Sequence, residues 1–291
     1  MTRKRRGNPI SGVVLVDKPA GVSANAVVQR IKRLYKAQKA GHTGTLDPFA
    51  TGLLPVCLGE ATKASAFQLN AEKCYRATLQ LGQRTDTADC EGEVVQTRPV
   101  PPLDRRTVEA VLTQFEGEIQ QVPPIYSALK KNGKPLYEYA RQGQNIEIEP
   151  RQVTIHQLTL LTLSDNRLTF EVRASKGTYI RTLGEDIARA LGTVGHLTQL
   201  RRLESGGLNI RDAWTLAHIE ADPTAALQPL TTLLPHLPQL EVTAAEAERL
   251  RHGNPISLAT PEVVLVMQAG VPVCIGERRN EQLWPKRLFN L

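Results

Sequence analysis

One acidic residue, Asp47, stands in a stretch whose composition suits a catalytic loop. Residues 41–52 (GHTGTLDPFATG) hold three glycines and three threonines. Glycine permits tight turns and the close approach of a ligand, and Pro48 stiffens the chain directly after the acid. A carboxylate presented in this way could act as a nucleophile or a general base. The competing interpretation is that Asp47 only caps a turn, as Asp before Pro often does.

Other common catalytic patterns are missing from the sequence. The four cysteines have neither the spacing of a zinc site nor that of a redox pair, so we expect them to be reduced. The six histidines form no HExxH pattern, and the chain has no Walker A loop and no GxGxxG motif. An enzyme built on this sequence is therefore expected to work without a metal ion, a nucleotide or any other cofactor.

The segment from residue 122 to residue 143 mixes aromatic and basic residues. Three of the six tyrosines, including Tyr126, lie there among glycines and prolines. Several lysine and arginine residues, including Lys130, lie in the same segment. Such a mixture suits RNA, because bases stack on aromatic rings while lysines meet phosphates. A surface loop with a small hydrophobic anchor has the same composition.

The charge of the chain also favours a polyanionic partner. Lys and Arg number 36 against 29 for Asp and Glu, which gives a net charge of +7. Nine residues from Met1 to Lys36 are basic and one, Asp17, is acidic. The chain has no apolar run of the roughly 18 residues that a membrane span needs, and residues 13–16 are too few for a signal-peptide core. We expect a cytoplasmic protein.

The residues above must be positioned by strands and helices, and these alternate irregularly along the sequence. We predict strands at residues 13–17, 53–58, 75–81, 168–174 and 200–203, and helices after an N-cap at Ser23, over residues 103–115 and over residues 179–191. Residues 227–240, rich in Leu and Pro, are expected to be a linker, and residues 241–291 a small unit. This order favours a mixed α+β fold over a doubly wound sheet.

Six segments together resemble the TruB family of bacterial tRNA pseudouridine synthases. They occur in the family's order across about residues 10 to 205, whereas the C-terminal stretch LRHGNP at residues 250–255 matches more loosely. The segments are GHTGTLDPFATGLLPVCLGEATK (41–63), KCYRA (73–77), LGQRTDT (81–87), PPIYSALK (123–130), SKGTYIRTL (175–183) and LRRL (200–203). Their joint occurrence by chance is negligible.

The resemblance implies a fold and a domain order. It implies the pseudouridine synthase fold, with a mixed, largely antiparallel central sheet flanked by helices. The catalytic domain would cover residues 1–235, with an insertion at residues 122–151 that grips RNA. A small PUA-like domain would follow at residues 236–291.

The resemblance also implies a reaction and its residues. The enzyme would break the bond from C1′ to N1 of a uridine, turn the uracil and rejoin it through C5. Asp47 matches the essential carboxylate, Arg181 the arginine that pairs with it, and Tyr75 the tyrosine that stacks on the uracil. Tyr179 and Leu200 match further pocket residues, and Lys176 a lysine with a substrate or structural role. Taken alone, Tyr75 and Leu200 also fit a hydrophobic core, and Arg181 also fits a phosphate contact or a surface charge.

The implied substrate is the T stem-loop of tRNA, modified at position 55. The target uridine must leave its stack, which costs a few kcal/mol, and His42 matches the residue that fills the vacated space. The family implies a monomer that needs no protein partner. One alternative is a noncatalytic RNA-binding or tRNA-folding protein on the same fold, and another is the related guide-RNA-dependent synthase. The intact set of Asp47, Tyr75 and Arg181 argues against the first, and the small C-terminal unit against the second.

Overall fold

The structure, a computed structural model, falls into two compact units. It describes residues 7–127, 129–131, 133–144, 146–258 and 260–291, without the side chains of Tyr137 and Arg141. Arg3, Lys4, Arg5 and Arg6 of the basic stretch lie outside the described residues. Unit 1 comprises residues 1–47, 52–70 and 205–291, and unit 2 comprises residues 48–51 and 71–204.

Unit 1 is organised around β1 (Gly12–Lys18). This strand pairs antiparallel with β3 (Thr51–Leu58) and parallel with β14 (Trp214–Thr215), and β3 also pairs antiparallel with β2 (Ala40–His42). Helix α1 (Ala24–Leu34) follows β1, and the Ser23 side chain accepts a hydrogen bond from the Ala26 amide at 3.2 Å. The predicted strand and the predicted N-cap are both confirmed.

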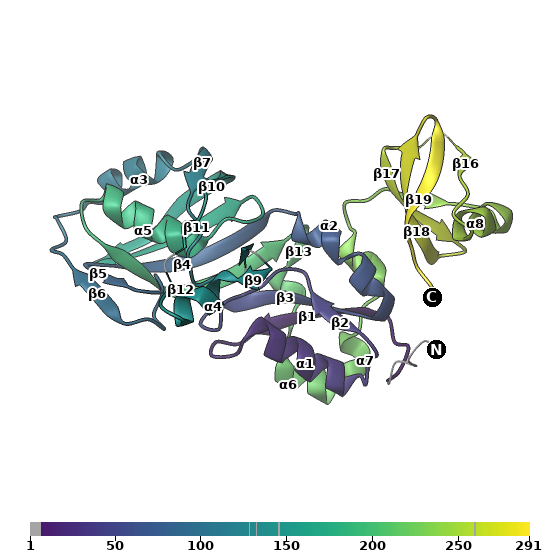
Figure 1. The fold of residues 1–291 in the computed structure, drawn as a ribbon, viewed down its shortest axis with the longest axis horizontal. Helices are drawn as coiled ribbons and strands as arrows, with labels where there is room; N and C mark the ends of the chain where they lie inside the picture. The colour runs from purple at the N-terminus through teal and green to yellow at the C-terminus, as the bar shows by residue number, and fades with distance from the viewer. Residues whose placement is uncertain (1–6, 128, 132, 145, 259) are drawn as a thin grey trace. The chain divides into compact units, whose positions relative to one another are not determined.

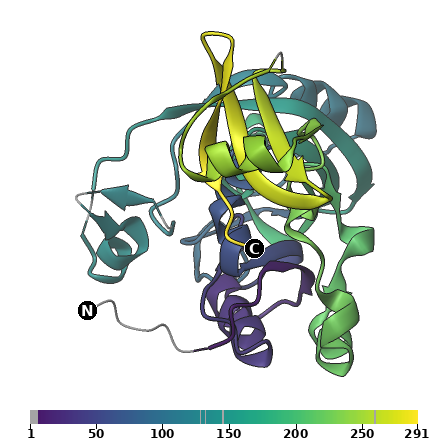
Figure 2. The ribbon, with the colours of Figure 1, turned by 90° about the vertical axis from the view of Figure 1, so that its right-hand side faces the viewer.

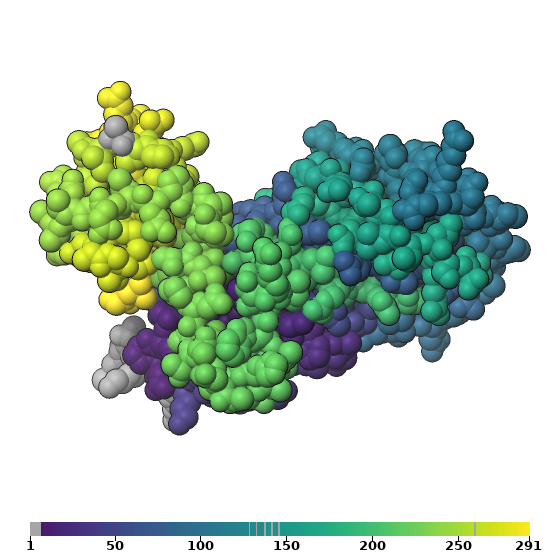
Figure 3. Space-filling view, turned by 180° about the vertical axis from the view of Figure 1, so that it is seen from behind, coloured from purple at the N-terminus to yellow at the C-terminus, as the bar shows by residue number. Residues whose placement is uncertain are grey.

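Residues 205–240 complete the core of unit 1. They form β13 (Leu208–Asn209), α6 (Leu216–Ala221), α7 (Pro223–Ala226) and the 3₁₀ helices η2 (Ile210–Asp212) and η3 (Leu230–Leu233). Leu230, Leu233 and Leu234 are buried in one cluster with Val13 and Leu53. The linker expected over residues 227–240 is therefore wrong for its first half, since burial of these leucines outweighs the helix-breaking prolines around them. Figure 3 shows green residues of this segment against purple N-terminal residues.

A five-stranded sheet occupies residues 239–288, where the sequence predicts a small unit. Its strand order is β15 (Gln239–Glu241), β17 (Val263–Gln268), β18 (Val271–Arg279), β19 (Gln282–Leu288) and β16 (Ile256–Ser257). Helix α8 (Ala244–Arg251) begins with a capping box between Thr243 and Glu246. Val264, Val266 and Leu283 form a core of their own, whereas Leu265 and Met267, which point to the opposite face, join the cluster of Val13.

Unit 2 is an antiparallel sheet that carries two helices. The strand order is β12 (Gly195–Ser205), β4 (Lys73–Leu81), β11 (Arg167–Ala174), β10 (Arg151–Ser164) and β7 (Gly117–Gln121). Helices α3 (Arg105–Thr113) and α5 (Ile180–Ala190) lie on one face of it (Figure 1). The hairpin of β5 (Gln83–Thr85) and β6 (Val94–Thr97) completes the unit. Each strand and helix predicted in this region is present, although β12 is longer than expected.

The expected insertion leaves the sheet between β7 and β10. It contains a two-stranded hairpin, β8 (Lys130–Lys131) with β9 (Lys134–Pro135), and the short helix α4 (Leu136–Arg141). Figure 2 shows this teal segment projecting from the unit. The remaining elements are η1 (Gly59–Lys63) and α2 (Ser65–Leu69) of unit 1.

The fold class predicted from the sequence is confirmed. The strands of both units pair mainly antiparallel, with parallel pairs at β1–β14 and β15–β17, and helices flank them. No helix within the described ranges is long and apolar enough to cross a membrane.

Close packing of α5 on β4 and β12 yields a stability prediction. A Cβ atom added at Gly195 would lie 2.9 Å from the Gln80 carbonyl oxygen and 2.9 Å from Ala188 Cβ, and the backbone oxygen cannot rotate away. Gly195→Ala should lower the free energy of unfolding by about 1–3 kcal/mol, the usual effect of overpacking. Urea unfolding followed by circular dichroism measures this, and a midpoint equal to that of the wild type would contradict the packing described.

Candidate functional site

Asp47 lies in the loop that joins β2 to β3. Its side chain is half-buried, whereas Leu46 is 4% exposed and Phe49 is 8% exposed. These two buried neighbours anchor the loop on both sides of the acid. Asp47 is the last residue of the first segment of unit 1, and Pro48 is the first residue of unit 2. The chain thus presents a carboxylate in an anchored loop at the point where it passes between units.

His42, the last residue of β2, is held by its own loop. The Gly44 amide donates a hydrogen bond to His42 Nδ1 at 3.2 Å. Because Nδ1 accepts, a neutral imidazole carries its proton on Nε2. The contact fixes the ring on a half-buried residue five positions before Asp47. The His42 ring therefore has a defined orientation, and its role in RNA binding stays a prediction.

The chain just beyond Asp47 is tied to the strand that carries Leu200. Thr51 Oγ1 donates to the Leu200 carbonyl at 3.5 Å and accepts from Arg201 Nη1 at 3.4 Å. Leu200 is 7% exposed, so both its core role and its predicted pocket role remain compatible with its position. The structure thus brings Leu200 next to residue 51.

Tyr75 lies on β4, opposite Val172 of β11. It is half-buried, and strand alternation places it on the same face as Lys73 and Ala77. Burial first, and then the nearby charges of Arg202 and Lys176, together lower the pKa of Lys73 to about 8. This face of unit 2 therefore gathers cationic side chains beside the tyrosine predicted to stack on uracil. Lys176 itself is exposed in the loop before α5.

Arg181, in the first turn of α5, has a buried guanidinium with partners in several segments of unit 2. It is 3% exposed, as is Asp89, whose Oδ2 lies 3.3 Å from Arg181 Nη1. Nη1 also donates to the Thr87 carbonyl at 2.9 Å, and Nη2 donates to the Tyr126 carbonyl at 2.8 Å. The predicted pairing of Arg181 with Asp47, a residue of the other unit, stays a prediction.

Asp89 was not predicted from the sequence. Its Oδ1 accepts hydrogen bonds from Thr87 Oγ1 at 2.7 Å and from the Glu91 amide at 3.0 Å. These bonds leave Oδ2 directed at the arginine. Its signal was an acid three residues after Asp86 in a turn-forming segment, but surface turns share that pattern. Only the burial of Asp89 separates it from them.

Tyr179 precedes α5 and is clamped by two side chains that were also missed. Gln121 forms two hydrogen bonds to its backbone, and the guanidinium of Arg151 lies 4.9 Å from the centre of its ring. Nothing local in the sequence marks either residue, because the first contact joins positions 58 residues apart.

The lysines of the insertion differ in their contacts. Lys131 Nζ donates to the Glu147 carbonyl at 2.5 Å, and Lys134 Nζ lies 4.5 Å from the centre of the Tyr139 ring. Lys130 is exposed, and its side chain has no hydrogen bond or ion pair with another described residue. Tyr126 is half-buried at the base of the insertion. Lys130 thus presents its charge to solvent.

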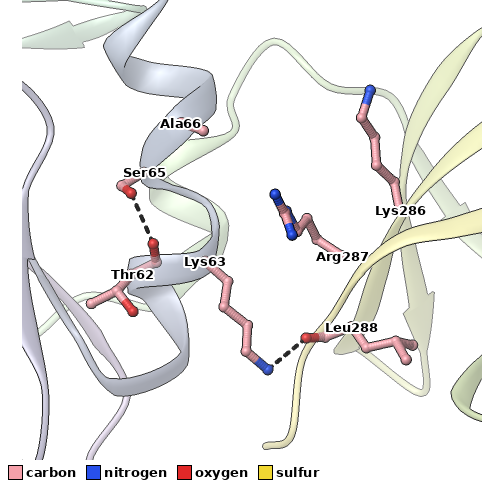
Figure 4. A pocket seen from close by; sticks show the side chains of 7 residues that line it. All are labelled: Thr62, Lys63, Ser65, Ala66, Lys286, Arg287 and Leu288. Atoms are coloured by element: carbon pink, nitrogen blue, oxygen red, sulfur yellow. Dashed lines mark hydrogen bonds between the residues drawn. The ribbon is translucent and has the colours of Figure 1, made fainter.

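A basic pocket of about 480 Å³ lies elsewhere in unit 1 (Figure 4). Lys63, Lys286 and Arg287 line it together with Thr62 and Ser65. Lys63 is paired with Glu60 at 2.6 Å and Lys286 with Glu277 at 2.5 Å, so much of the positive charge is compensated. None of the residues predicted from the sequence lines this pocket. Among the described residues, no group of His, Cys, Asp and Glu side chains could hold a metal ion.

Two family models match consecutive parts of the chain. The TruB family pseudouridylate synthase N-terminal domain matches residues 32–180, and the tRNA pseudouridylate synthase B C-terminal domain matches residues 181–235. The boundary between them falls at the start of α5, between Ile180 and Arg181.

Similar proteins match over most of the chain. The protein named tRNA pseudouridine synthase B from Chromohalobacter salexigens is 53% identical over 89% of this chain and 86% of its own. The protein of that name from Hydrogenovibrio crunogenus is 49% identical over 99% of this chain and 97% of its own. A crystal structure of a Cbf5-Nop10-Gar1 complex is similar at 27% identity and a TM-score of 0.70, covering 91% of this chain and 78% of that chain. The chain therefore belongs to the TruB family of pseudouridylate synthases, which confirms the family expected from its motifs.

Proposed function

We propose that this protein is an isomerase that converts uridine 55 in the T loop of tRNA to pseudouridine, with Asp47 as its catalytic carboxylate. The observation that carries the proposal is the half-buried Asp47 on a loop anchored by Leu46 and Phe49, within a motif of the TruB family. The tRNA substrate follows from the name shared by relatives that are about half identical over nearly the whole chain.

The chemistry requires no external oxidant, reductant or group donor. The bond from C1′ to N1 breaks, the uracil turns, and a bond from C1′ to C5 forms. C5 then loses its proton and N1 gains one, so substrate and product have the same atoms and electrons. We propose that no cofactor takes part. Asp47 could attack C1′ or C6, or remove the proton on C2′, and each role needs an ionised and positioned carboxylate.

The other predicted residues receive complementary roles. Tyr75 would stack on the uracil, and Tyr179 and Leu200 would line the pocket. Arg181 would stabilise the anionic Asp47, since a neighbouring guanidinium favours the charged form of a carboxyl group. Lys176 lies close enough to Lys73 to lower its pKa, so both would add positive potential near the RNA backbone.

RNA recognition is assigned to His42 and the insertion. His42 would enter the space left by the flipped nucleotide, where its ring can stack on the neighbouring base. Tyr126 and Lys130, on residues 122–151, would contact the T stem-loop. We further propose a catalytic domain at residues 1–235, a PUA-like domain at residues 236–291, and a monomer that works in the cytoplasm, the compartment that holds tRNA, without a protein partner.

The first prediction concerns Asp47. An unmodified tRNA transcript incubated with the wild-type protein should gain pseudouridine in the T loop, and Asp47→Asn should give none while its dissociation constant stays within about twofold, because the amide cannot act as nucleophile or base. Tritium release from C5 of uridine measures the product. Product from both proteins would mean that Asp47 is misassigned. Tight binding without product from either would favour a noncatalytic RNA-binding protein.

The second prediction concerns the buried ion pair. Arg181→Ala should lower turnover roughly a hundredfold, the scale on which loss of one charge-stabilising group acts, with little change in RNA affinity. Asp89→Asn keeps the shape of the side chain but removes its charge, and should lower turnover roughly tenfold, or about 1.4 kcal/mol. Breaking a buried pair can also cost about 3–5 kcal/mol of stability, so thermal unfolding must be measured alongside. Equal losses of turnover and affinity would instead indicate a phosphate contact.

The third prediction concerns Lys130. Lys130→Ala should weaken tRNA binding and reduce the slope of log K against log salt concentration by roughly 0.7–0.9, the value for one phosphate contact. Turnover at saturating tRNA should not change. Arg106→Ala, which removes an exposed charge from α3, is the control. If the two variants lose affinity equally, the insertion has no special part in binding.

A further inference from the structure

Both ends of the insertion are attached to the short segment that carries two predicted site residues. Gln121 is the last residue of β7, directly before the insertion, and Arg151 is its last residue and the first of β10. Both contact residues 177–179, which lead into α5 and Arg181. In a third contact, Arg181 Nη2, in the first turn of α5, donates a hydrogen bond to the Tyr126 carbonyl within the insertion. The base of the insertion and the entry to α5 thus form one connected structure.

The side-chain amide of Gln121 forms hydrogen bonds with both the carbonyl group and the amide group of Tyr179. Its Nε2 donates to the Tyr179 carbonyl at 3.1 Å, and its Oε1 accepts from the Tyr179 amide at 2.7 Å. Gln121 is 1% exposed, so water does not replace these bonds. Two bonds to one residue fix the plane of the backbone as a strand neighbour would. The direction in which Tyr179 leaves the backbone is set by this plane.

Arg151 contacts the ring of Tyr179, the residue whose backbone Gln121 holds. Its guanidinium lies 4.9 Å from the centre of the Tyr179 ring, within the range of a cation–π contact. The same group donates a hydrogen bond to the Gly177 carbonyl. Gly177 has φ +81°, and a Cβ atom there would lie 3.3 Å from Arg151 Cζ. The backbone turn and the ring are therefore held against the same guanidinium.

We infer that Gln121 is a positioning residue, which together with Arg151 sets the orientation of Tyr179 and links it to the insertion that grips RNA. The inference rests on the proposed function, in which Tyr179 lines the uridine pocket. A purely structural role for Gln121 would show as a loss of stability, with turnover of the folded protein unchanged. A positioning role predicts a loss of turnover that depends on the Tyr179 side chain.

The test compares Gln121→Met with Gln120→Met. Methionine keeps the length of Gln121 but forms neither bond, and Gln120 is the exposed neighbour on the same strand. Gln121→Met should slow single-turnover pseudouridine formation roughly tenfold to a hundredfold, as a misplaced contact group does, with the dissociation constant for tRNA within about twofold. Gln120→Met should match the wild type. If Gln121→Met does not fold, Gln121→Asn, too short to reach Tyr179, replaces it.

A double-mutant cycle and amide exchange separate the possible outcomes. In the Tyr179→Ala background, Gln121→Met should slow the reaction by less than about twofold, because Gln121 would act through the missing ring. The Tyr179 amide should exchange with solvent faster in Gln121→Met than in the wild type. Unchanged turnover, equal effects in both backgrounds or unchanged exchange would overturn the inference and leave the proposed function intact. A wild-type protein that binds tRNA but forms no pseudouridine would overturn the proposed function, and the role of Gln121 in it.

Discussion

The burial of one charged group, the guanidinium of Arg181, constrains much of unit 2. A buried charge must be paired and hydrogen-bonded, because removing it from water costs several kcal/mol. Asp89 supplies the compensating negative charge. The carbonyl groups of Thr87, in the same turn, and of Tyr126, in the insertion, accept hydrogen bonds. Helix α5, the turn after β5 and the base of the insertion must therefore meet at one point. This requirement fixes the entry to α5, and with it the segment that carries Tyr179.

The elements of the fold follow from periodicity to a large extent. Alternation along residues 75–81 and 168–174 predicts β4 and β11, and Ser23 predicts the start of α1. Residues 227–240 show where such reasoning fails. Their prolines break regular structure and resemble a linker, but Leu230 and Leu233 are buried. Whether a leucine beside proline is buried depends on what packs over it, which local sequence does not specify.

The residues of the candidate site also fall into those that the sequence predicts and those that it does not. Asp47, Tyr75 and Arg181 are recognisable because they stand in motifs that resemble a family, whereas charge and periodicity alone left a turn cap, a core tyrosine and a surface arginine open. Asp89, Gln121 and Arg151 contact predicted site residues, and none of the three was predicted. Their importance comes from contacts such as that between Gln121 and Tyr179, formed across many positions of the chain. Contacts of this kind become visible only in three dimensions.

These supporting contacts hold the base of the insertion on the segment that leads into α5. The insertion carries an exposed charge at Lys130, and its hairpin is held by local bonds such as that from Lys131 to Glu147. Its two ends, however, are anchored on residues 177–181 by a buried amide, a guanidinium and a backbone carbonyl. The base of the insertion is therefore bonded to the segment before α5, whereas the hairpin is bonded mainly within the insertion itself. Under the proposed function, an RNA stem that orders the hairpin would act on Tyr179 through these anchors.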